Sequence, residues 1–593
     1  MSLGGKNTKF LRYFQLYAKF AENKKIKVKF VFRNNILLLT SRLLFYVLFT
    51  FSFVSISVTK GQESVGINKS KLFTVGGSIN MATGYYYVKG IPPRYRTWNY
   101  QFSGNLTIDV FGLNLPFSIA LSDQNRTYSQ PFNNFGVSPR YKWITAHFGY
   151  RNLTFSPFTL AGHIFWGAGV ELNPWLFRIS AMYGRFKKAV HGDTSNLLIF
   201  PPTYRRDGYA FKIGFGSSSS YVDFIFLRAR DDKNSLDTTS QKFVNPEENL
   251  VFGISSKLRF SNNLRMEIDW GASSYTLNLN SETINIDTFP TVPKFFSKIY
   301  TVRLSTQFTT AIQSSLIFSN NLFMAKLSYK RIGPDYKSMG MYFSESDVQS
   351  LTASLSLPVF QRKVRLNGSI GYQHDNLLNN KAKTTKRIVG SAGLSFFLNN
   401  FGADLSYSTY GIMQSKGLAP IIDSLRYSRV NQNANLNLRL TLPKDAIFWN
   451  FSVNSFVQKT SGDDPKAKSI LSSISYGGNF SVQYSNSSRK MNFGLTSNIL
   501  GSETGERTTM FYGPSVSFSK MFNKIGLTAQ LGYQLSYVDK VSNGGIFNGI
   551  LSSSFQVDNH NEIRMDINFQ SSTQKIQNNF NEVRISMGYS YRF

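Results

Sequence analysis

The sequence contains no cysteine and few charged residues for its length. Among 593 residues there is no Cys, and Asp, Glu, Lys and Arg together make up 17%. The missing thiols exclude a disulfide framework, a thiolate metal site, a Cys nucleophile and a lipid anchor on Cys. Acidic residues are especially scarce, because 33 Asp and Glu stand against 66 Lys and Arg, for a formal net charge of +33.

Aromatic residues are abundant instead. They make up 15% of the chain, with 53 Phe and 31 Tyr, and hydrophobic residues reach 42%. Few charges and many aromatics give a poor surface for a soluble multidomain protein, whereas the chain is too polar for a bundle of membrane helices. This balance is typical of a transmembrane β-barrel, whose strands alternate lipid-facing and lumen-facing residues.

The N-terminal 61 residues predict an export signal that is removed. Residues 1–35 are rich in Lys and Arg, and residues 36–58 are mostly apolar. The basic region is unusually long, so translation starting downstream of Met1 stays an alternative. Another is an N-terminal membrane anchor, although its run of roughly 16 apolar residues is shorter than the ~20 that span a bilayer. The interpretation assigns residues 62–593 to the barrel.

The rest of the chain repeats one pattern. Apolar residues alternate with polar or small ones, for example over 98–110, 433–442 and 527–537. Period-two alternation puts successive side chains on opposite faces of a strand. No separate helical or apolar layer exists in the sequence to cover the apolar face, so lipid must cover it. A sheet in lipid must close, because an open edge would leave backbone groups unpaired.

Turn lengths predict the topology. Short connections at 260–264, 318–322, 397–401 and 521–526 alternate with long polar segments, as expected for short periplasmic turns and long outer loops. The alternation breaks at 124–159. This segment is either an insertion that folds into or over the lumen, or it contains two further strands. The prediction is a single all-β, antiparallel transmembrane barrel of about 24 strands, within a range of 22–26.

The most specific pattern is an alternation of apolar residues that runs to the last position: Val583, Ile585, Met587, Tyr589, Tyr591 and Phe593. It resembles the C-terminal signature of Gram-negative outer-membrane β-barrels, and the Asn, Lys, Phe and Ile content resembles barrels of Bacteroidota. The resemblance implies an outer membrane with its lipids and lipopolysaccharide, and barrel assembly machinery that recognises the Phe593 strand. The alternative is an edge strand of a soluble β-protein.

The position of the first expected strand indicates whether a plug domain can precede the barrel. TonB-dependent receptors carry a large plug domain before their first strand, whereas the first strand here is expected at about 72–88, so we expect no N-terminal plug. A barrel of this size encloses a wide interior. Its own loops or a partner protein must then occlude it. The sequence predicts passage or gating of solutes or polypeptides; the alternative is a non-catalytic accessory subunit of an outer-membrane machine for secretion or barrel assembly.

Catalytic and cofactor signatures are missing. The five His residues show no metal-ligand spacing, and there is no Gly-x-Ser-x-Gly elbow. No compact basic domain or zinc pattern indicates a nucleic acid partner. We expect no enzyme activity, no cofactor and no metal.

The segment 138–190 is dense in Gly and aromatic residues and overlaps the break in topology. We expect it to form a constriction or contact surface in the lumen, with Trp143, His147, His163 and Trp166 as candidates. The alternatives are an ordinary aromatic belt at the membrane interface and, for the two His, polar lumen residues in a hydrogen-bond network.

Basic residues gather at both ends of the expected strands. A periplasmic rim would attract anions by its field, with the candidates Lys257, Arg259, Arg265 and Arg365. Outer loops would pair with lipopolysaccharide phosphates, with the candidates Arg94, Arg96, Arg126, Lys187, Arg205 and Arg206. The alternative for both groups is excess charge that serves solubility alone.

Overall fold

The structure, a computed structural model, describes residues 73–123, 134–192, 201–284, 299–342, 345–381, 383–416, 428–462, 472–505, 507–575 and 578–593. The chain divides into two units, Met1–Lys69 and Ser70–Phe593, and all described residues belong to the second. The expected export signal (1–61) and Arg126 lie outside the described residues.

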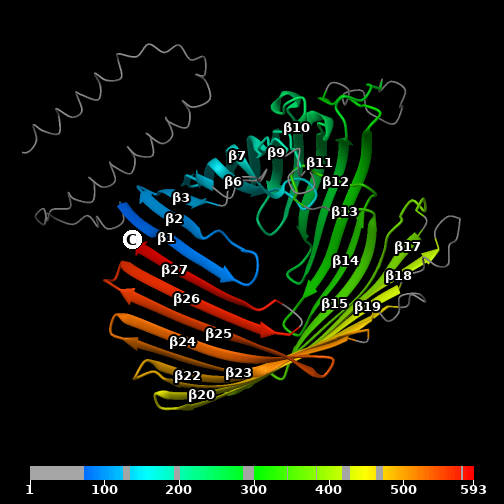
Figure 1. Cartoon of the computed structure of the whole chain (residues 1–593). Coiled ribbons are helices and arrows are strands. Elements are labelled where there is room, and N and C mark those ends of the chain that lie inside the picture. The colour runs from blue at the N-terminus through cyan, green and yellow to red at the C-terminus, as the bar shows by residue number, and fades with distance from the viewer. Residues whose placement is uncertain are drawn as a thin grey trace, which may run out of the picture. The chain divides into compact units, whose positions relative to one another are not determined.

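Antiparallel strands make up most of the described chain (Figure 1). Their bounds are Phe73–Lys89 (β1), Trp98–Val110 (β2), Leu113–Ser122 (β3), Asn134–Val137 (β4), Arg140–Tyr141 (β5), Ile144–Thr154 (β6), Ala161–Leu172 (β7), Phe177–Lys187 (β8), Arg206–Gly216 (β9), Tyr221–Asp231 (β10), Glu248–Arg259 (β11), Leu264–Thr276 (β12), Thr306–Ser319 (β13), Met324–Ile332 (β14), Val348–Val359 (β15), Val364–His374 (β16), Lys383–Phe397 (β17), Phe401–Lys416 (β18), Ser428–Lys444 (β19), Ile447–Gly462 (β20), Ser473–Asn486 (β21), Met491–Thr504 (β22), Arg507–Phe522 (β23), Ile525–Val538 (β24), Val541–Gln556 (β25), Asn561–Gln574 (β26) and Phe580–Arg592 (β27).

Two short 3-10 helices, Lys233–Ser235 and Ser240–Lys242, lie in the loop between β10 and β11. No helix in the described part of the chain is long and apolar enough to cross a membrane.

The sheet closes on itself. Apart from β4 and β5, each strand pairs with the strands before and after it, and β27 pairs with β1 from Ser78↔Arg592 to Lys89↔Asn581. The last backbone N–H, that of Phe593, donates to the Gly77 carbonyl at 3.0 Å. The prediction of a closed, all-β antiparallel barrel is confirmed.

The described strands occupy 26 positions around the barrel, because β4 and β5 share one. Both pair with β3 on one side and β6 on the other, through Ala120↔Asn134, Asn114↔Arg140, Gly136↔Gly149 and Tyr141↔Ile144. Residues 134–154 therefore belong to the wall, as in the alternative with two further strands, and not to an insertion. The 26 positions lie at the upper end of the predicted range of 22–26. Residues 124–133 lie outside the described residues.

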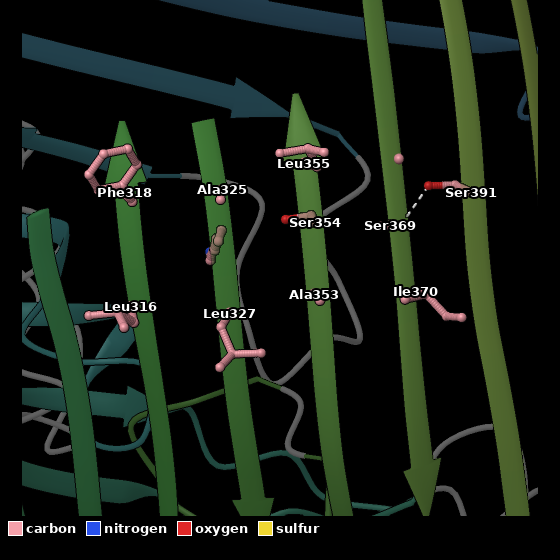
Figure 2. A pocket seen from close by; sticks show the side chains of 12 residues that line it. Leu316, Phe318, Ala325, Leu327, Ala353, Ser354, Leu355, Ser369, Ile370 and Ser391 are labelled. Atoms are coloured by element: carbon pink, nitrogen blue, oxygen red, sulfur yellow. Dashed lines mark hydrogen bonds between the residues drawn. The ribbon is translucent and has the colours of Figure 1, made fainter. Parts of the chain in front are cut away.

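The outer face of the wall is apolar. On β9, Phe211, Ile213 and Phe215 are exposed, while the residues between them are buried. Figure 2 shows the same face on β13–β16, where the register aligns Leu316, Leu327, Ala353 and Ile370 in one row. Ser354 and Ser369 lie at the alternate positions that face the interior, as period-two geometry requires. The shallow hollow between these apolar side chains suits lipid acyl chains.

A carboxylate network fixes the seam between β1 and β27 from the inside. Glu582 is 3% exposed and accepts hydrogen bonds from Arg584 Nε at 2.8 Å and Nη2 at 2.6 Å. The Tyr86 hydroxyl donates to its other oxygen at 3.3 Å, and Arg94 Nη1 approaches to 3.5 Å. These contacts join β1, the β1–β2 loop and β27 around one buried carboxylate.

Replacing Glu582 by Ala should lower the stability of the folded barrel by about 1–3 kcal/mol, because charge-assisted bonds to a buried carboxylate are lost. The measurement is the temperature at which the barrel unfolds in detergent. Glu562→Ala is the matched control, since its pair with Arg592 (3.2 Å) lies at the exposed rim and should contribute ~0–1 kcal/mol. Equal shifts in the two variants would contradict the role of Glu582.

Candidate functional site

The interior carries an apolar cluster where a wide channel would be polar. A row of lumen-facing residues runs across β7–β11 through Gly169, Met182, Ala210, Leu227 and Val251, which are paired in register. From Met182 to Val251 these residues are at most 3% exposed. Water cannot reach them, so another part of the chain must cover them.

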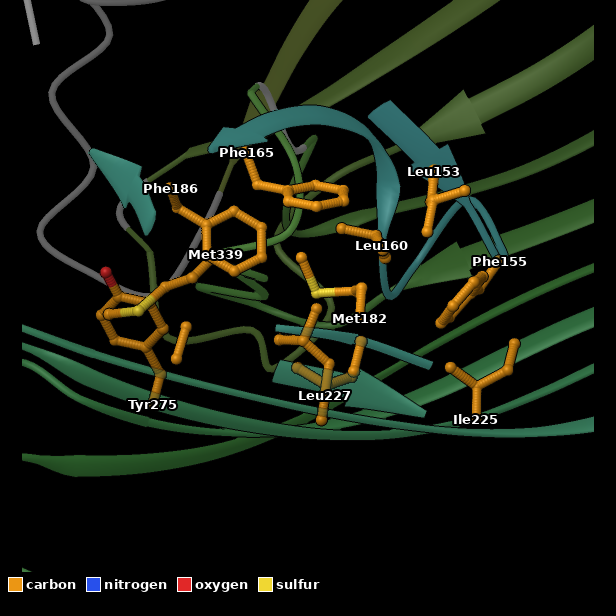
Figure 3. Packing of buried hydrophobic residues seen from close by; sticks show 13 residues of the cluster. Leu153, Phe155, Leu160, Phe165, Met182, Phe186, Ile225, Leu227, Tyr275 and Met339 are labelled. Atoms are coloured by element: carbon orange, nitrogen blue, oxygen red, sulfur yellow. The ribbon is translucent and has the colours of Figure 1, made fainter. Parts of the chain in front are cut away.

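The first cover is the connection between β6 and β7, residues 155–160, which we call the inward turn. Phe155 and Leu160 belong to the apolar cluster, at 6% and 0% exposed, and Phe158 is also buried. Figure 3 shows Leu160 beside Phe165 and Met182, and Phe155 between Leu153 and Ile225. A turn with three large apolar residues is stable only where it packs, which explains why it folds into the barrel.

The second cover is the β14–β15 connection, whose residues 333–342 we call the inward loop. Tyr336 donates its hydroxyl hydrogen to the Phe158 carbonyl at 2.6 Å, and the Ser338 hydroxyl donates to the Thr159 carbonyl at 2.6 Å. The Ala161 N–H donates to the Gly340 carbonyl at 2.9 Å. The inward loop and the inward turn therefore form one unit.

Buried contacts hold the inward loop to the wall. The Met339 N–H donates to Asn249 Oδ1 at 2.9 Å, and Met339 joins the apolar cluster. Gly340 fits only because it lacks a side chain. A Cβ there would lie 2.5 Å from the Thr159 carbonyl oxygen and 2.6 Å from Leu227 Cδ1.

Ion pairs flank the apolar cluster towards both ends of the barrel. On the long-loop side, Arg206 donates to both oxygens of Asp231 (2.7 and 3.0 Å) and to Glu247 (2.7 Å). On the short-turn side, Arg178 donates to both oxygens of Asp223 at 2.8 and 3.0 Å. Buried charges persist in this way only when they are paired.

Two of the expected constriction residues, His147 and His163, face the interior and are 8% and 2% exposed. His147 Nε2 lies 3.0 Å from Glu171 Oε1, and its Nδ1 lies 3.0 Å from the Ser138 hydroxyl. A carboxylate only accepts, so Nε2 donates to Glu171, and in the neutral ring Nδ1 then accepts from Ser138. His163 stacks on Tyr342 of the inward loop, with ring centroids 4.2 Å apart.

The other two, Trp143 and Trp166, do not meet these His. Trp166 is 43% exposed on the outer face, where Arg185 lies over its ring at 5.4 Å. Trp143 lies in the short turn before β6 and is 46% exposed. Residues 163 and 166 are an odd number apart in one strand, so they point to opposite faces. A constriction role stays a proposal for the two His alone.

Three of the four expected rim bases come together. Lys257, Arg259 and Arg265 lie around the β11–β12 turn, where Lys257 and Arg265 approach Glu267 at 3.7 and 3.4 Å. Arg365 lies apart on β16, over the ring of Phe397 at 5.9 Å. The negative charge of Glu267 reduces the field that the first three bases could exert on an anion.

The expected outer-loop bases divide into two groups. Arg94, Arg96 and Arg205 keep about half of their side chains exposed (50%, 54% and 49%) while they pair with Glu582, Asp123 and Asp207. Arg206 and Lys187 lie at strand ends instead, paired in register. Arg206 is buried and held by Asp231, so it is no outer-loop residue.

Sequence reasoning missed the charges inside the β8–β10 wall. Lys212 is 7% exposed and lies over the Phe155 ring at 5.0 Å, close to the Arg178–Asp223 pair in the sheet register. The signal was available, because a single charge stands inside each of the apolar runs 208–216 and 221–227. Within the described residues, no three His, Asp or Glu side chains gather as a metal site would require.

Asp347 links the start of the inward loop to the β16–β17 connection, because its N–H donates to the Gly333 carbonyl at 3.1 Å. Its carboxylate accepts from the N–H groups of Asn376 (3.1 Å) and Leu377 (2.9 Å) and pairs with Lys381. Burial raises the pKa of Asp347, but the bonds from Lys381 and the two N–H groups outweigh burial and hold it below its ordinary value.

The stabilisation by Asp347 should be complete above pH ~3.9, the ordinary Asp pKa, and should disappear as the pH falls through the depressed pKa. We expect Asp347→Asn to lower the unfolding temperature at neutral pH, by the equivalent of about 1–3 kcal/mol, and to make no difference in strong acid. Asp445→Asn, in an exposed short turn, is the control. A difference that stays constant with pH would contradict this role.

Comparisons with known proteins concern the fold alone. No protein-family model matches the chain, and no curated protein matches it. The P pilus usher (PapC) translocation pore matches at 11% identity over 88% of this chain and 99% of that chain, with a TM-score of 0.37. The ferric enterobactin receptor PfeA from Pseudomonas aeruginosa matches at 9% over 88% and 80%, with a TM-score of 0.39. Acinetobacter baumannii OccAB2 matches at 10% over 63% and 97%, with a TM-score of 0.27.

Likenesses this distant carry no argument about what the chain does. The structure itself supplies the stronger observation, since its antiparallel wall is closed, has an even number of strand positions and is apolar outside. These are the properties of a β-barrel that spans a membrane.

Proposed function

We propose that this barrel passes or gates solutes or polypeptides across the outer membrane, and that its own inward turn and inward loop occlude part of the lumen. No separate plug domain and no catalytic step belong to this proposal. The observation that carries it is the apolar cluster on the inner face of β7–β11, which both segments cover. A wall made only to line water would carry polar residues at these positions.

In this proposal, the inward turn and the inward loop form a unit that can be displaced from the wall. Their contacts with each other include hydrogen bonds to backbone carbonyls, such as those from Tyr336 and Ser338, and the packing of the Phe158 and Tyr336 rings. Loops that close a site are drawn from the less stable parts of a fold. At the outer surface, the exposed Arg94, Arg96 and Arg205 are proposed to contact lipopolysaccharide phosphates. The β27 strand ending in Phe593 is proposed to engage the barrel assembly machinery.

Gly340→Val should open the lumen. Its Cβ would meet the Thr159 carbonyl and Leu227, and overpacking of this kind costs about 1–3 kcal/mol, so the inward loop should leave the wall. We expect a higher single-channel conductance in planar bilayers. Gly76→Val is the control, because a Cβ at Gly76 meets no atom within 4 Å. A folded Gly340→Val barrel with unchanged conductance would reject the occluding role.

The second candidate is an accessory subunit that presents its rim to a protein partner. One observation favours it: the tips of short turns carry exposed apolar side chains, Phe111 (74%), Trp175 (95%), Leu322 (72%) and Phe360 (76%). Purification of the native complex in mild detergent separates the two candidates. A stoichiometric partner that dissociates from Trp175→Ala with Phe360→Ala supports the subunit, whereas a lone conducting barrel supports passage.

A further inference from the structure

The wall formed by β20–β25 differs from the β6–β12 wall in its charge. Strands β20, β21, β22, β24 and β25 contain only Lys459 and Glu503 as charged residues. Lys459 lies two residues from the exposed Val457, and Glu503 lies four residues from the exposed Ile499. Residues an even number apart in a strand point to the same face, so both charges face outward. The lumen-facing positions of these five strands are consequently neutral, in a chain with a formal net charge of +33. Of the adjoining strands, β23 begins with Arg507, and β19 carries Arg439, which pairs with Asp404.

Amides form a row across this neutral wall. The register pairs Asn437 with Asn454, Asn454 with Asn479, and Asn479 with Asn498, on the adjacent strands β19–β22. Asn454 Nδ2 donates to Asn479 Oδ1 at 2.9 Å. Neighbouring strands lie about 4.8 Å apart, which sets the spacing of the row. Each amide offers two donors and an acceptor, so most of this capacity remains directed at the lumen.

An apolar row runs beside the amides. Two residues away along each strand, on the same face, the register aligns Phe456, Gly477, Leu500 and Phe511. Phe456 and Leu500 are 37% and 48% exposed although they face the interior. The Phe456 ring covers Gly477, since a Cβ there would lie 2.7 Å from Phe456 Cε1 and 2.9 Å from Cζ. The ring therefore lies against the wall and presents its other face to the lumen.

Both rows line one groove. Its volume is about 740 Å³, and Ser406, Asn435 and Gln534 add further neutral polar groups. An anion finds no cation among its lining residues, and an acyl chain would leave the amides unsatisfied. An extended peptide repeats every 3.3–3.4 Å along its length, which does not match a row spaced at about 4.8 Å. A pyranose ring is about as wide as the strand spacing, with hydroxyls at its rim and C–H groups on its faces.

We propose that this groove binds a neutral linear oligosaccharide, with one sugar ring stacked on Phe456 and hydroxyls bonded to the Asn454–Asn479–Asn498 row. The inference rests on the proposed passage function, for which it names the substrate class. Ring stacking supplies the apolar contact, and the amides satisfy hydroxyl donors and acceptors without a charge. The groove orients the sugar along the wall that the inward loop leaves uncovered.

The test is the block of ion current through the purified full-length barrel in planar bilayers by maltohexaose, cellohexaose and a dextran hexamer. At least one should interrupt the current in a saturable manner. Phe456→Ala and Asn479→Leu should each weaken this block at least tenfold, a difference of about 1.4 kcal/mol. The matched controls are Phe480→Ala, whose side chain lies on the outer face of β21, and Asn492→Leu, which lies outside the groove. Neither should change the block.

The outcomes separate the inference from the proposed function. A conducting barrel that none of the three sugars blocks overturns the sugar groove and leaves passage standing. Block by a neutral Gly-Ser hexapeptide but by no sugar overturns it as well. If the barrel does not conduct, calorimetry of sugar binding in detergent replaces the current: binding that Phe456→Ala removes supports the groove while passage fails, and no binding overturns both.

Discussion

Lipid offers no hydrogen-bond partner to a backbone N–H or C=O, so every strand in the wall needs a neighbour on each side. The pairing of β1 with β27 supplies the last of these neighbours. With closure, inside and outside become distinct for every residue, and the two-residue period of a strand assigns each side chain to one of them. The interior clusters and the neutral groove both depend on this assignment.

The lumen has two chemically different walls. Around β6–β12, a buried apolar row holds the inward turn and the inward loop inside the barrel, and ion pairs such as Arg178–Asp223 join neighbouring wall strands beside it. Along β20–β25 the interior is lined by amides and hydroxyls, with Phe456 and Leu500 exposed among them. One wall is occupied by covalently attached segments, whereas the other is left accessible.

The alternation of side chains made the barrel predictable from the sequence, because the signal repeats in nearly every strand. The number of strands was harder to predict from the sequence. Residues 134–141 form a strand broken at Ser138–Pro139, where proline lacks the N–H that a ladder needs, so the local pattern was weak. The odd spacing of His163 and Trp166 in one strand could have shown from the sequence that they point to opposite faces. It could not have revealed that Phe158 meets Tyr336, because contacts between distant segments follow from register and loop packing rather than from local pattern.

The seam between β1 and β27 also dictates how the barrel can form. Its pairs join residues about as far apart in the chain as the wall allows, for example Ser78 and Arg592. Until β27 pairs with β1, both end strands present unpaired N–H and C=O groups that could pair with other chains. Contacts of such sequence separation form slowly, since the entropy of closing the loop is lost before the contacts stabilise it. Completion of the last strand is therefore the step that ends the chain's exposure to aggregation.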